Sequence, residues 1–172
     1  MKYYTDGYTT GGNPSNGGGF TVVDESGHLL TTEVINKEGF TNNEAELLGI
    51  EWAVENAQHG DTISTDSMCM LSWIHSGKSK ARRDLQPIMR RIGLLVMDRN
   101  LNLCWEGRDF NLAGIYNEKM KLDTGRPAEW VKKSKHYLKH RGNKMKRNYK
   151  NLLPSSASLE ESEQQVSFLR SI

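Results

Sequence analysis

Glu46 is a carboxylate on what should be the buried face of a helix. Residues 41–60 have the spacing of an amphipathic helix. Its apolar stripe, counted three and four residues on from Glu46, consists of Gly49, Ile50, Ala53, Val54 and Ala57. An unpaired charge on that face would cost several kcal/mol. Either Glu46 lies at the rim of the stripe, where it reaches water or a basic partner, or a cation binds there among further carboxylates.

Two aspartates, Asp6 and Asp66, have a sequence context that could bring them to Glu46. Each is expected at the end of a short strand, and Gly7 after Asp6 lets the backbone turn sharply. Strand ends beside a helix are where sites form in open α/β sheets. If the two strands are neighbours and the helix packs on them, three carboxylates meet, and their repulsion requires a counter-cation. All-oxygen ligands select hard ions such as Mg²⁺ or Mn²⁺.

The elements that must position these carboxylates follow from hydrophobic spacing and turn residues. A helix is predicted to begin near residue 43, with Asn42 or Asn43 as its N-cap and His59-Gly60 as its stop. Strands are predicted at 2–5, 20–23, 28–35, 62–65 and 101–105, and further helices at 68–75, 87–98 and 111–122. The Gly/Asn/Pro-rich residues 8–20 are predicted to form a turn. This order indicates an α/β domain in which three antiparallel strands come first and helix crossovers then add parallel ones.

The composition is that of a globular protein with one substantial domain. The chain has 172 residues, of which 36% are hydrophobic and 26% charged. No apolar run approaches the roughly 18 residues of a membrane span, and the first ten residues lack the apolar core of a signal peptide. Cys69 and Cys104 make neither a disulfide framework nor a metal-ligand spacing. We therefore expect a monomer in a reducing, cytoplasmic setting, without a membrane partner.

Positive charge is concentrated near the C-terminus. Residues 119–150 hold twelve Lys or Arg against two acids, a local net charge of +10 that leaves about −8 for the rest of a chain whose total is +2. We expect residues 124–153 to be a basic, partly helical extension and residues 154–172 to be a flexible tail. The extension is either a solvated surface or a phosphate-binding segment that gives sequence-independent affinity with a steep salt dependence.

Four motifs occur in a diagnostic order. They are YTDG at 4–7, Gly12-Asn13-Pro14, TNNEAEL at 41–47 and TDS at 65–67. In this order and spacing they resemble type 1 ribonuclease H, of the ribonuclease H-like superfamily, over roughly residues 1–120. The resemblance implies an α/β ribonuclease H-like fold. Its five-stranded mixed sheet would have the order 3-2-1-4-5, flanked by helices, in a catalytic domain of residues 1–123.

The resemblance also implies a reaction. In the family the matching carboxylates, here Asp6, Glu46 and Asp66, hold two Mg²⁺ ions, with Mn²⁺ as the alternative, and the enzyme hydrolyses the RNA strand of an RNA–DNA hybrid. Two ions about 4 Å apart stabilise the attacking and leaving oxygens of such a displacement. RNA would be distinguished from DNA by its 2′-hydroxyl groups. Gly12, Asn13 and Asn43 match positions that contact the hybrid's backbone.

The fourth carboxylate of the family's metal site has no direct match. Its usual aspartate position falls on Gly114, or on Lys121 in the other alignment of the motif. Glu118 lies one helical turn after Gly114, on the same face, and its longer side chain could reach back. We expect Glu118 to be the fourth ligand, with Asp123 in reserve and a surface role for both as the alternative. The histidine that many members carry before this helix is also absent.

A short loop between two predicted helices carries cations in place of the longer basic insertion of some relatives. Lys78, Lys80 and Arg82 are predicted to contact phosphates, against the alternative of a solvated turn. At the far C-terminus, residues 165–169 hold a Gln and an adjacent Phe-Leu pair. That arrangement loosely resembles peptides that dock replication enzymes onto a sliding clamp, which would raise the local enzyme concentration. Plain disorder or packing of the tail on the domain is the alternative.

Three functions remain open from the sequence. The first is an endonuclease that hydrolyses the RNA strand of RNA–DNA hybrids by two-metal-ion catalysis. The second is a catalytically weak or silent hybrid-binding module of the same fold, since a fold alone does not establish activity. The third is a nuclease of this fold that acts on DNA. Retention of Asp6, Glu46 and Asp66 favours an active enzyme, and the GNP and TNN motifs favour hybrid recognition.

Overall fold

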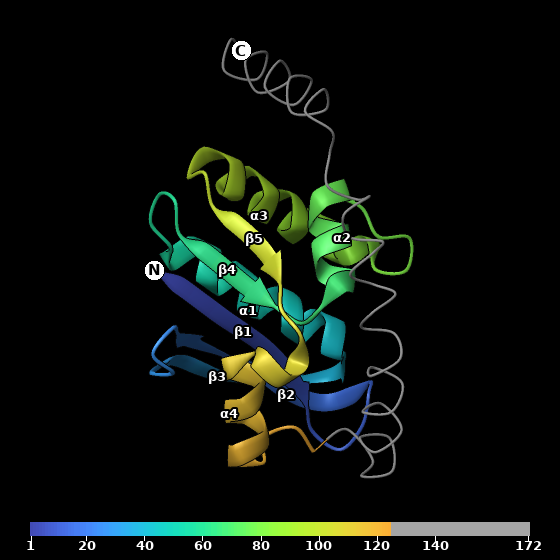
Figure 1. Cartoon of the computed structure of the whole chain (residues 1–172). Helices are drawn as coiled ribbons and strands as arrows, with labels where there is room; N and C mark the ends of the chain where they lie inside the picture. Colours follow the sequence, from blue (N-terminus) through green and yellow to red (C-terminus); the bar gives the residue numbers. More distant parts are fainter. Residues whose placement is uncertain (125–172) are drawn as a thin grey trace. The chain divides into compact units, whose positions relative to one another are not determined.

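The computed structural model describes residues 1–124. Apart from Thr124, the predicted basic extension and tail lie outside the described residues, and so does the predicted sliding-clamp motif. Figure 1 shows the arrangement of the described elements. The strands are β1 (Lys2–Thr9), β2 (Ser15–Asp24), β3 (Leu29–Phe40), β4 (Thr62–Thr65) and β5 (Asn102–Trp105). The helices are α1 (Asn42–Asn56), α2 (Met68–Ser76), α3 (Gln86–Asp98) and α4 (Leu112–Met120), with 3-10 turns η1 (Arg83–Leu85) and η2 (Arg108–Phe110).

The five strands form one mixed sheet in the order β3-β2-β1-β4-β5. Strands β1, β2 and β3 pair antiparallel, whereas β4 pairs parallel with both β1 and β5. In Figure 1, β1, β4 and β5 accordingly run side by side in the same direction. The predicted fold class and strand order are confirmed. Because successive side chains of a strand point to opposite faces, Gly7 of β1 faces α1 and Asp6 faces α4.

The prediction of a turn over residues 8–20 was wrong at both ends. Strand β1 continues to Thr9, and β2 already begins at Ser15, so that Asp6 lies inside β1 and not at its end. The glycines belong to the strand because nothing larger fits there. A Cβ on Gly18 would lie 2.2 Å from the Tyr8 carbonyl oxygen, and one on Gly19 would lie 1.9 Å from that of Glu33. Glycine here permits close strand packing and does not signal a turn.

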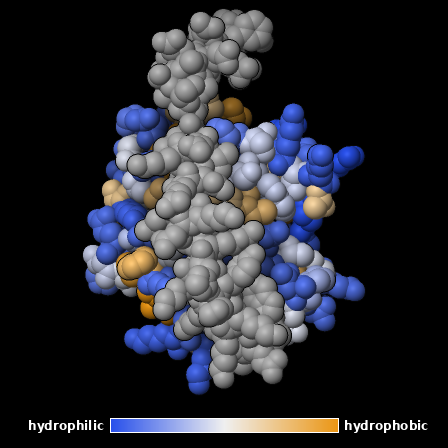
Figure 2. Space-filling model, turned by 45° about the vertical axis from the view of Figure 1, so that its right-hand side comes forward, coloured by the Kyte–Doolittle hydropathy of each residue, from blue (hydrophilic) through white to orange (hydrophobic). Residues whose placement is uncertain are grey.

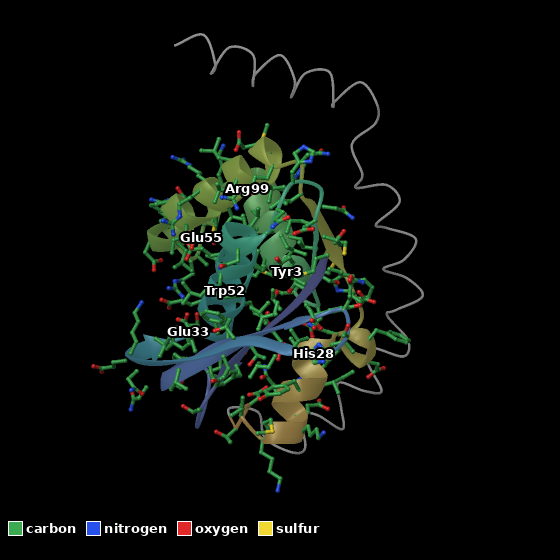
Figure 3. All side chains as sticks on the ribbon, turned by 90° about the vertical axis from the view of Figure 1, so that its left-hand side faces the viewer. Tyr3, His28, Glu33, Trp52, Glu55 and Arg99 are labelled. Atoms are coloured by element: carbon green, nitrogen blue, oxygen red, sulfur yellow. The ribbon has the colours of Figure 1, made fainter. Side chains whose placement is uncertain are left out.

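Both ends of α1 differ from the predicted ones. The N-cap is Thr41, whose hydroxyl accepts a hydrogen bond from the Glu44 N–H at 3.3 Å. The helix ends at Asn56, short of His59-Gly60. Its last carbonyls bind Arg99, whose Nη1 lies 2.9 to 3.0 Å from the carbonyl oxygens of residues 54, 55 and 57. Figure 3 shows Arg99 beside the end of α1 that carries Glu55. This tertiary cap has no local sequence signal.

The core lies between the sheet and α1, as the apolar stripe predicts. Ile50, Ala53 and Val54 are buried there together with Phe20 and Val22 of β2. Gly49 allows the close approach that its position suggests, since a Cβ at that position would lie 3.2 Å from Phe20 Cβ. Away from the grey atoms, the face shown in Figure 2 is largely hydrophilic with scattered apolar side chains. None of the described helices combines the length and the hydropathy needed to cross a bilayer.

Candidate active site

Three carboxylates converge where β1, β4 and α1 meet. The parallel pairing sets Thr5 opposite Thr65, so the residues that follow them, Asp6 and Asp66, are neighbours. Glu46 lies in the first half of α1, where the Gly7 backbone lowers the pKa of its carboxyl group. One oxygen from each of Asp6, Glu46 and Asp66 lies within 4.8 Å of the others. We call these three residues the carboxylate cluster.

Burial and mutual repulsion make the carboxylate cluster hard to ionise. Asp6 and Glu46 are each only 3% exposed. Burial, followed by the charge of Asp66, raises the pKa of Asp6 to about 8. Burial also raises the pKa of Glu46 well above its usual range, with Asp6 and Asp66 contributing, and burial raises the pKa of Asp66. Buried like charges of this kind require a compensating cation.

The donor set of the carboxylate cluster fits a hard divalent cation. All the candidate ligand atoms are carboxylate oxygens, which Mg²⁺ and Mn²⁺ prefer. The Oε2 atom of Glu46 is buried and has no hydrogen-bond partner among the described residues, while its Oε1 has only a long contact of 3.5 Å from Asn42 Nδ2. Buried polar atoms are almost always satisfied. An oxygen left open beside two more carboxylates is therefore suited to a metal ion.

Two asparagines of the α4 region orient the aspartates of the carboxylate cluster. Asn117 Nδ2 donates to Asp6 Oδ2 at 2.7 Å, and Asn117 Oδ1 accepts from Thr21 Oγ1 at 2.6 Å. Asn111 is the N-cap of α4, donates to the Thr5 carbonyl at 2.9 Å and hydrogen-bonds the Asp66 side chain. Sequence reasoning used both asparagines only as motif context. For Asn117, the sequence signal that was available is the Asn117-Glu118 pair, which matches the N-E form of the motif.

Arg108 is a cation that acts on all three members of the carboxylate cluster, and sequence reasoning missed it. Its positive charge lowers the pKa of all three carboxyl groups, against the larger effect of burial. It comes from η2, just before α4, where the sequence has no match for the family's histidine. The guanidinium therefore offsets part of the negative charge. It does not reach the full compensation that two divalent ions would give.

The structure separates the two candidates for a fourth carboxylate. Glu118, the predicted ligand, has a side chain that is 53% exposed, and its Oε1 lies 3.6 Å from Arg108 Nε. It is not brought into the carboxylate cluster. The Asp123 side chain is only 9% exposed, lies 4.0 Å from Arg108 Nη2 and raises the pKa of Asp6 through its charge. Burial and charge thus associate Asp123 with the carboxylate cluster more closely than Glu118.

The motif residues predicted to contact the hybrid's backbone lie around the start of α1. Asn13 is exposed, and its Oδ1 accepts a hydrogen bond from the Asn42 N–H at 3.1 Å, which links the β1–β2 loop to α1. Gly12 is half-buried in the same loop, and Asn43 is half-buried in the first turn of α1. Asn13 and Asn43 therefore lie at the first turn of α1, the helix that carries Glu46.

The predicted phosphate-binding cations lie in the connection between α2 and α3. Lys78 and Lys80 are exposed. Arg82 differs, because its guanidinium is engaged within the protein. It binds Glu44 and Thr41 of the α1 region and Asp84 of its own loop. Two of the three predicted cations are thus accessible to a ligand, and the third holds a helix terminus.

The metal-free protein is expected to lose stability as the pH rises from about 4 to about 8. The Asp6 carboxyl titrates at about 3.9 in an unfolded chain and at about 8 in the folded protein. In this window the unfolded chain has released a proton that the folded protein still binds, so raising the pH favours unfolding. Thermal melts in EDTA at about pH 5 and about pH 8 measure the effect. Asp6→Asn should narrow the difference, and a wild-type melting temperature that rises with pH would contradict this prediction.

Comparisons with known proteins identify the fold. No family model matches the chain, and no curated protein matches its sequence. RNase H1 from the halophilic archaeon Halobacterium salinarum NRC-1 aligns with a TM-score of 0.53 and 20% identity, over 70% of this chain and 96% of that one. The N-terminal RNase H domain of a Mycobacterium tuberculosis protein was solved as a fusion with maltose-binding protein. It aligns with a TM-score of 0.52 and 20% identity, over 70% of this chain and 96% of that one.

A third similar structure is LC11-RNase H1, a protein isolated from compost by a metagenomic approach and solved in complex with an RNA/DNA hybrid. It has a TM-score of 0.48 and 24% identity, over 64% of this chain and 87% of that one. The archaeal and mycobacterial structures carry the assignment, and at their level of identity the likeness establishes the fold. The chain has the fold of the type 1 ribonucleases H.

Proposed function

We propose that this protein hydrolyses the RNA strand of RNA–DNA hybrids. The observation that carries the proposal is the carboxylate cluster. Asp6, Glu46 and Asp66 stand in the four-motif pattern of type 1 ribonuclease H, and their oxygens gather within 4.8 Å of one another. A silent binding module would have no need to hold three repelling, buried carboxylates together at a cost in stability.

Asp6, Glu46 and Asp66 would hold two Mg²⁺ ions, with Mn²⁺ as the alternative. Bound divalent cations supply charge neutralisation at the phosphodiester and activation of the attacking water. The protein's own part is to orient the carboxylate oxygens that would bind the ions. Asn117 orients Asp6, and Asn111 orients Asp66. The exposed Lys78 and Lys80, together with the residues around Asn13 and Asn43, would contact the backbone of the hybrid.

Asn117→Ala is expected to lower cleavage and raise the Mg²⁺ concentration required, because the Asp6 carboxylate loses the donor that orients it. Residues that orient metal ligands are typically worth about 10- to 100-fold. The control is Thr21→Val, which removes the outer bond of the Thr21–Asn117–Asp6 chain and leaves the bond to Asp6 in place. An Mg²⁺ requirement for Asn117→Ala equal to that of the wild type would argue against this role.

The fourth ligand is proposed to be Asp123, on the basis of its burial and its electrostatic interaction with Asp6. We expect Asp123→Asn to raise the Mg²⁺ concentration at half-maximal cleavage by about tenfold, and Glu118→Gln to change it little. Both substitutions also remove an ion-pair partner of Arg108. A difference between the two variants therefore cannot come from the loss of an Arg108 ion pair alone. The reverse ranking would restore Glu118, and no change in either variant would indicate a site of three carboxylates.

Side-by-side cleavage of three duplexes tests the proposed function. The substrates are a hybrid, duplex RNA and duplex DNA of one sequence, each with Mg²⁺ or with EDTA. We expect Mg²⁺-dependent cleavage of the RNA strand in the hybrid, and neither of the other duplexes should be cut comparably. Binding of the hybrid without cleavage would support the silent module, and cleavage of duplex DNA would support a DNA nuclease.

A further inference from the structure

Glu44 is a second buried acid in α1, outside the carboxylate cluster. It is 5% exposed and lies in the first turn of the helix. Two cations from different parts of the chain neutralise it. Lys37 of β3 approaches its Oε1 at 2.5 Å, and Arg82, from the connection between α2 and α3, approaches its Oε2 at 3.0 Å. Breaking the ion pairs of such a buried carboxylate costs much free energy, because removing one partner leaves the other charge without compensation.

Arg82 holds the N-cap of α1 as well as Glu44. Its Nη1 donates to Thr41 Oγ1 at 2.8 Å while its Nη2 donates to Glu44. Thr41 and Glu44 have the T-x-x-E spacing of a capping box, in which the glutamate would ordinarily turn back to the N-cap backbone. Here the Glu44 carboxylate is bound to Arg82 and Lys37. The planar fork of one guanidinium thus holds both the N-cap and the third residue of the helix.

The contact of Arg82 with Thr41 and Glu44 joins two parts of the proposed substrate surface, the first turn of α1 and the α2–α3 connection. The first turn of α1 leads to Glu46, two residues after Glu44, and the Asn42 N–H binds Asn13 in the β1–β2 loop. The α2–α3 connection carries the exposed Lys78 and Lys80. Asp84 also binds Arg82, through Nε and Nη2, but it belongs to the same connection and its side chain is 59% exposed, so this contact does not tie the connection to α1.

We propose that Glu44 and Arg82 form a positioning pair that fixes the lysine-bearing α2–α3 connection against the start of α1. The carboxylate cluster and the lysines then engage one hybrid at a fixed spacing. The inference rests on the proposed function. Arg82 acts here through Glu44 and Thr41, and it is not itself the phosphate contact that its sequence context predicted.

The direction in which one substitution changes hybrid affinity distinguishes positioning from simple electrostatics. Glu44→Gln removes a negative charge from the proposed binding surface, and electrostatics alone would make binding of a polyanion tighter. The positioning pair predicts weaker binding instead, because Arg82 loses its buried partner and the connection is released. Arg82→Lys gives a second contrast. It keeps the charge, but an ammonium cannot replace the fork that reaches Thr41 and Glu44 together.

The test measures hybrid affinity by fluorescence anisotropy in the Asp66→Asn background, and KM and kcat in the otherwise wild-type chain. The variants are Glu44→Gln, Arg82→Ala, Arg82→Lys and the Glu44→Gln, Arg82→Ala double variant. We expect each single change to weaken binding and raise KM by about 10- to 100-fold, with kcat much less affected. The double variant should be no worse than the poorer single one, because both remove one interaction.

Arg99→Ala is the matched control. It removes an arginine that holds the opposite end of the same helix (Figure 3), so it should lower the melting temperature without changing KM. Asp84→Asn should change neither the melting temperature nor KM. Tighter binding by Glu44→Gln, additive losses in the double variant, full affinity in Arg82→Lys, or an equal rise in KM for Arg99→Ala would each overturn the positioning pair. A wild-type chain that neither binds nor cuts hybrid would overturn the proposed function and this inference together.

Discussion

Asp6→Asn is expected to reduce cleavage of an RNA–DNA hybrid by more than about a thousandfold, the scale on which a main electrostatic contribution to catalysis is lost. The substitution keeps the size of the side chain, and the new amide oxygen can still accept the hydrogen bond from Asn117. What disappears is one charged ligand of the carboxylate cluster. Because burial and the neighbouring charges raise the pKa of this carboxyl group to about 8, ionising it opposes folding, and the substitution should raise the melting temperature of the metal-free protein at about pH 8.

Activity and thermal melts in EDTA are to be measured on the same preparations of Asp6→Asn. Asp98→Asn is the matched control, since Asp98 is an exposed aspartate at the end of α3, and it should leave both quantities near those of the wild type. Cleavage by Asp6→Asn within tenfold of the wild-type rate would remove Asp6 from the active site. A melting temperature well below that of the wild type would contradict the repulsion inferred for the carboxylate cluster.

Gly7→Ala is expected to prevent α1 from docking on the sheet. A Cβ at position 7 would lie 2.3 Å from the Glu46 backbone nitrogen and 2.5 Å from the Ala45 carbonyl carbon. Overpacking costs about 1–3 kcal/mol where side chains can adjust. Here the neighbours are backbone atoms of a helix that also carries Glu46, so we expect a loss of stability above about 3 kcal/mol or no folded protein. Urea denaturation followed by circular dichroism measures the change.

Gly93→Ala provides the comparison for Gly7→Ala. Gly93 lies in α3, and a Cβ there would meet only the Ile74 carbonyl oxygen at an ordinary 3.7 Å. Alanine in a helix interior is favoured over glycine by about 0.5–1 kcal/mol, so this variant should be as stable as the wild type or more stable. Equal denaturation midpoints for the two variants would show that the close approach at Gly7 does not determine the packing of α1.

Much of the fold could be predicted because its signals are local. The apolar spacing after Glu46 identifies a buried helix face, and the order of strands and helices indicates the mixed sheet that the structure contains. The predictions failed where tertiary contacts override local preference. Gly18 and Gly19 look like turn residues, yet they pair in a strand because neighbouring carbonyls leave no room for a side chain. The end of α1 is set by Arg99, more than forty residues away in the sequence.

The carboxylate cluster could likewise be anticipated from its motifs, and its supporting residues could not. Asp6, Glu46 and Asp66 stand in recognisable contexts, and the structure brings them together. Arg108 and Asn117 act across more than a hundred positions on Asp6, and no periodicity encodes such a contact. Arg82 shows the converse, since a basic loop suggests phosphate binding, but only three-dimensional structure reveals that Glu44 already binds this guanidinium.

A calorimetric titration of Mg²⁺ into the wild-type chain and into Glu46→Gln tests the central claim most directly, because it requires no substrate. Glu46 contributes the buried oxygen that has no hydrogen-bond partner within residues 1–124, so the variant should lose Mg²⁺ binding, whereas Glu55→Gln, at the far end of α1, should retain it. Binding by the wild type and Glu55→Gln but not by Glu46→Gln is the predicted result. Equal Mg²⁺ affinity in all three proteins, or no binding in any, would contradict a metal site at the carboxylate cluster.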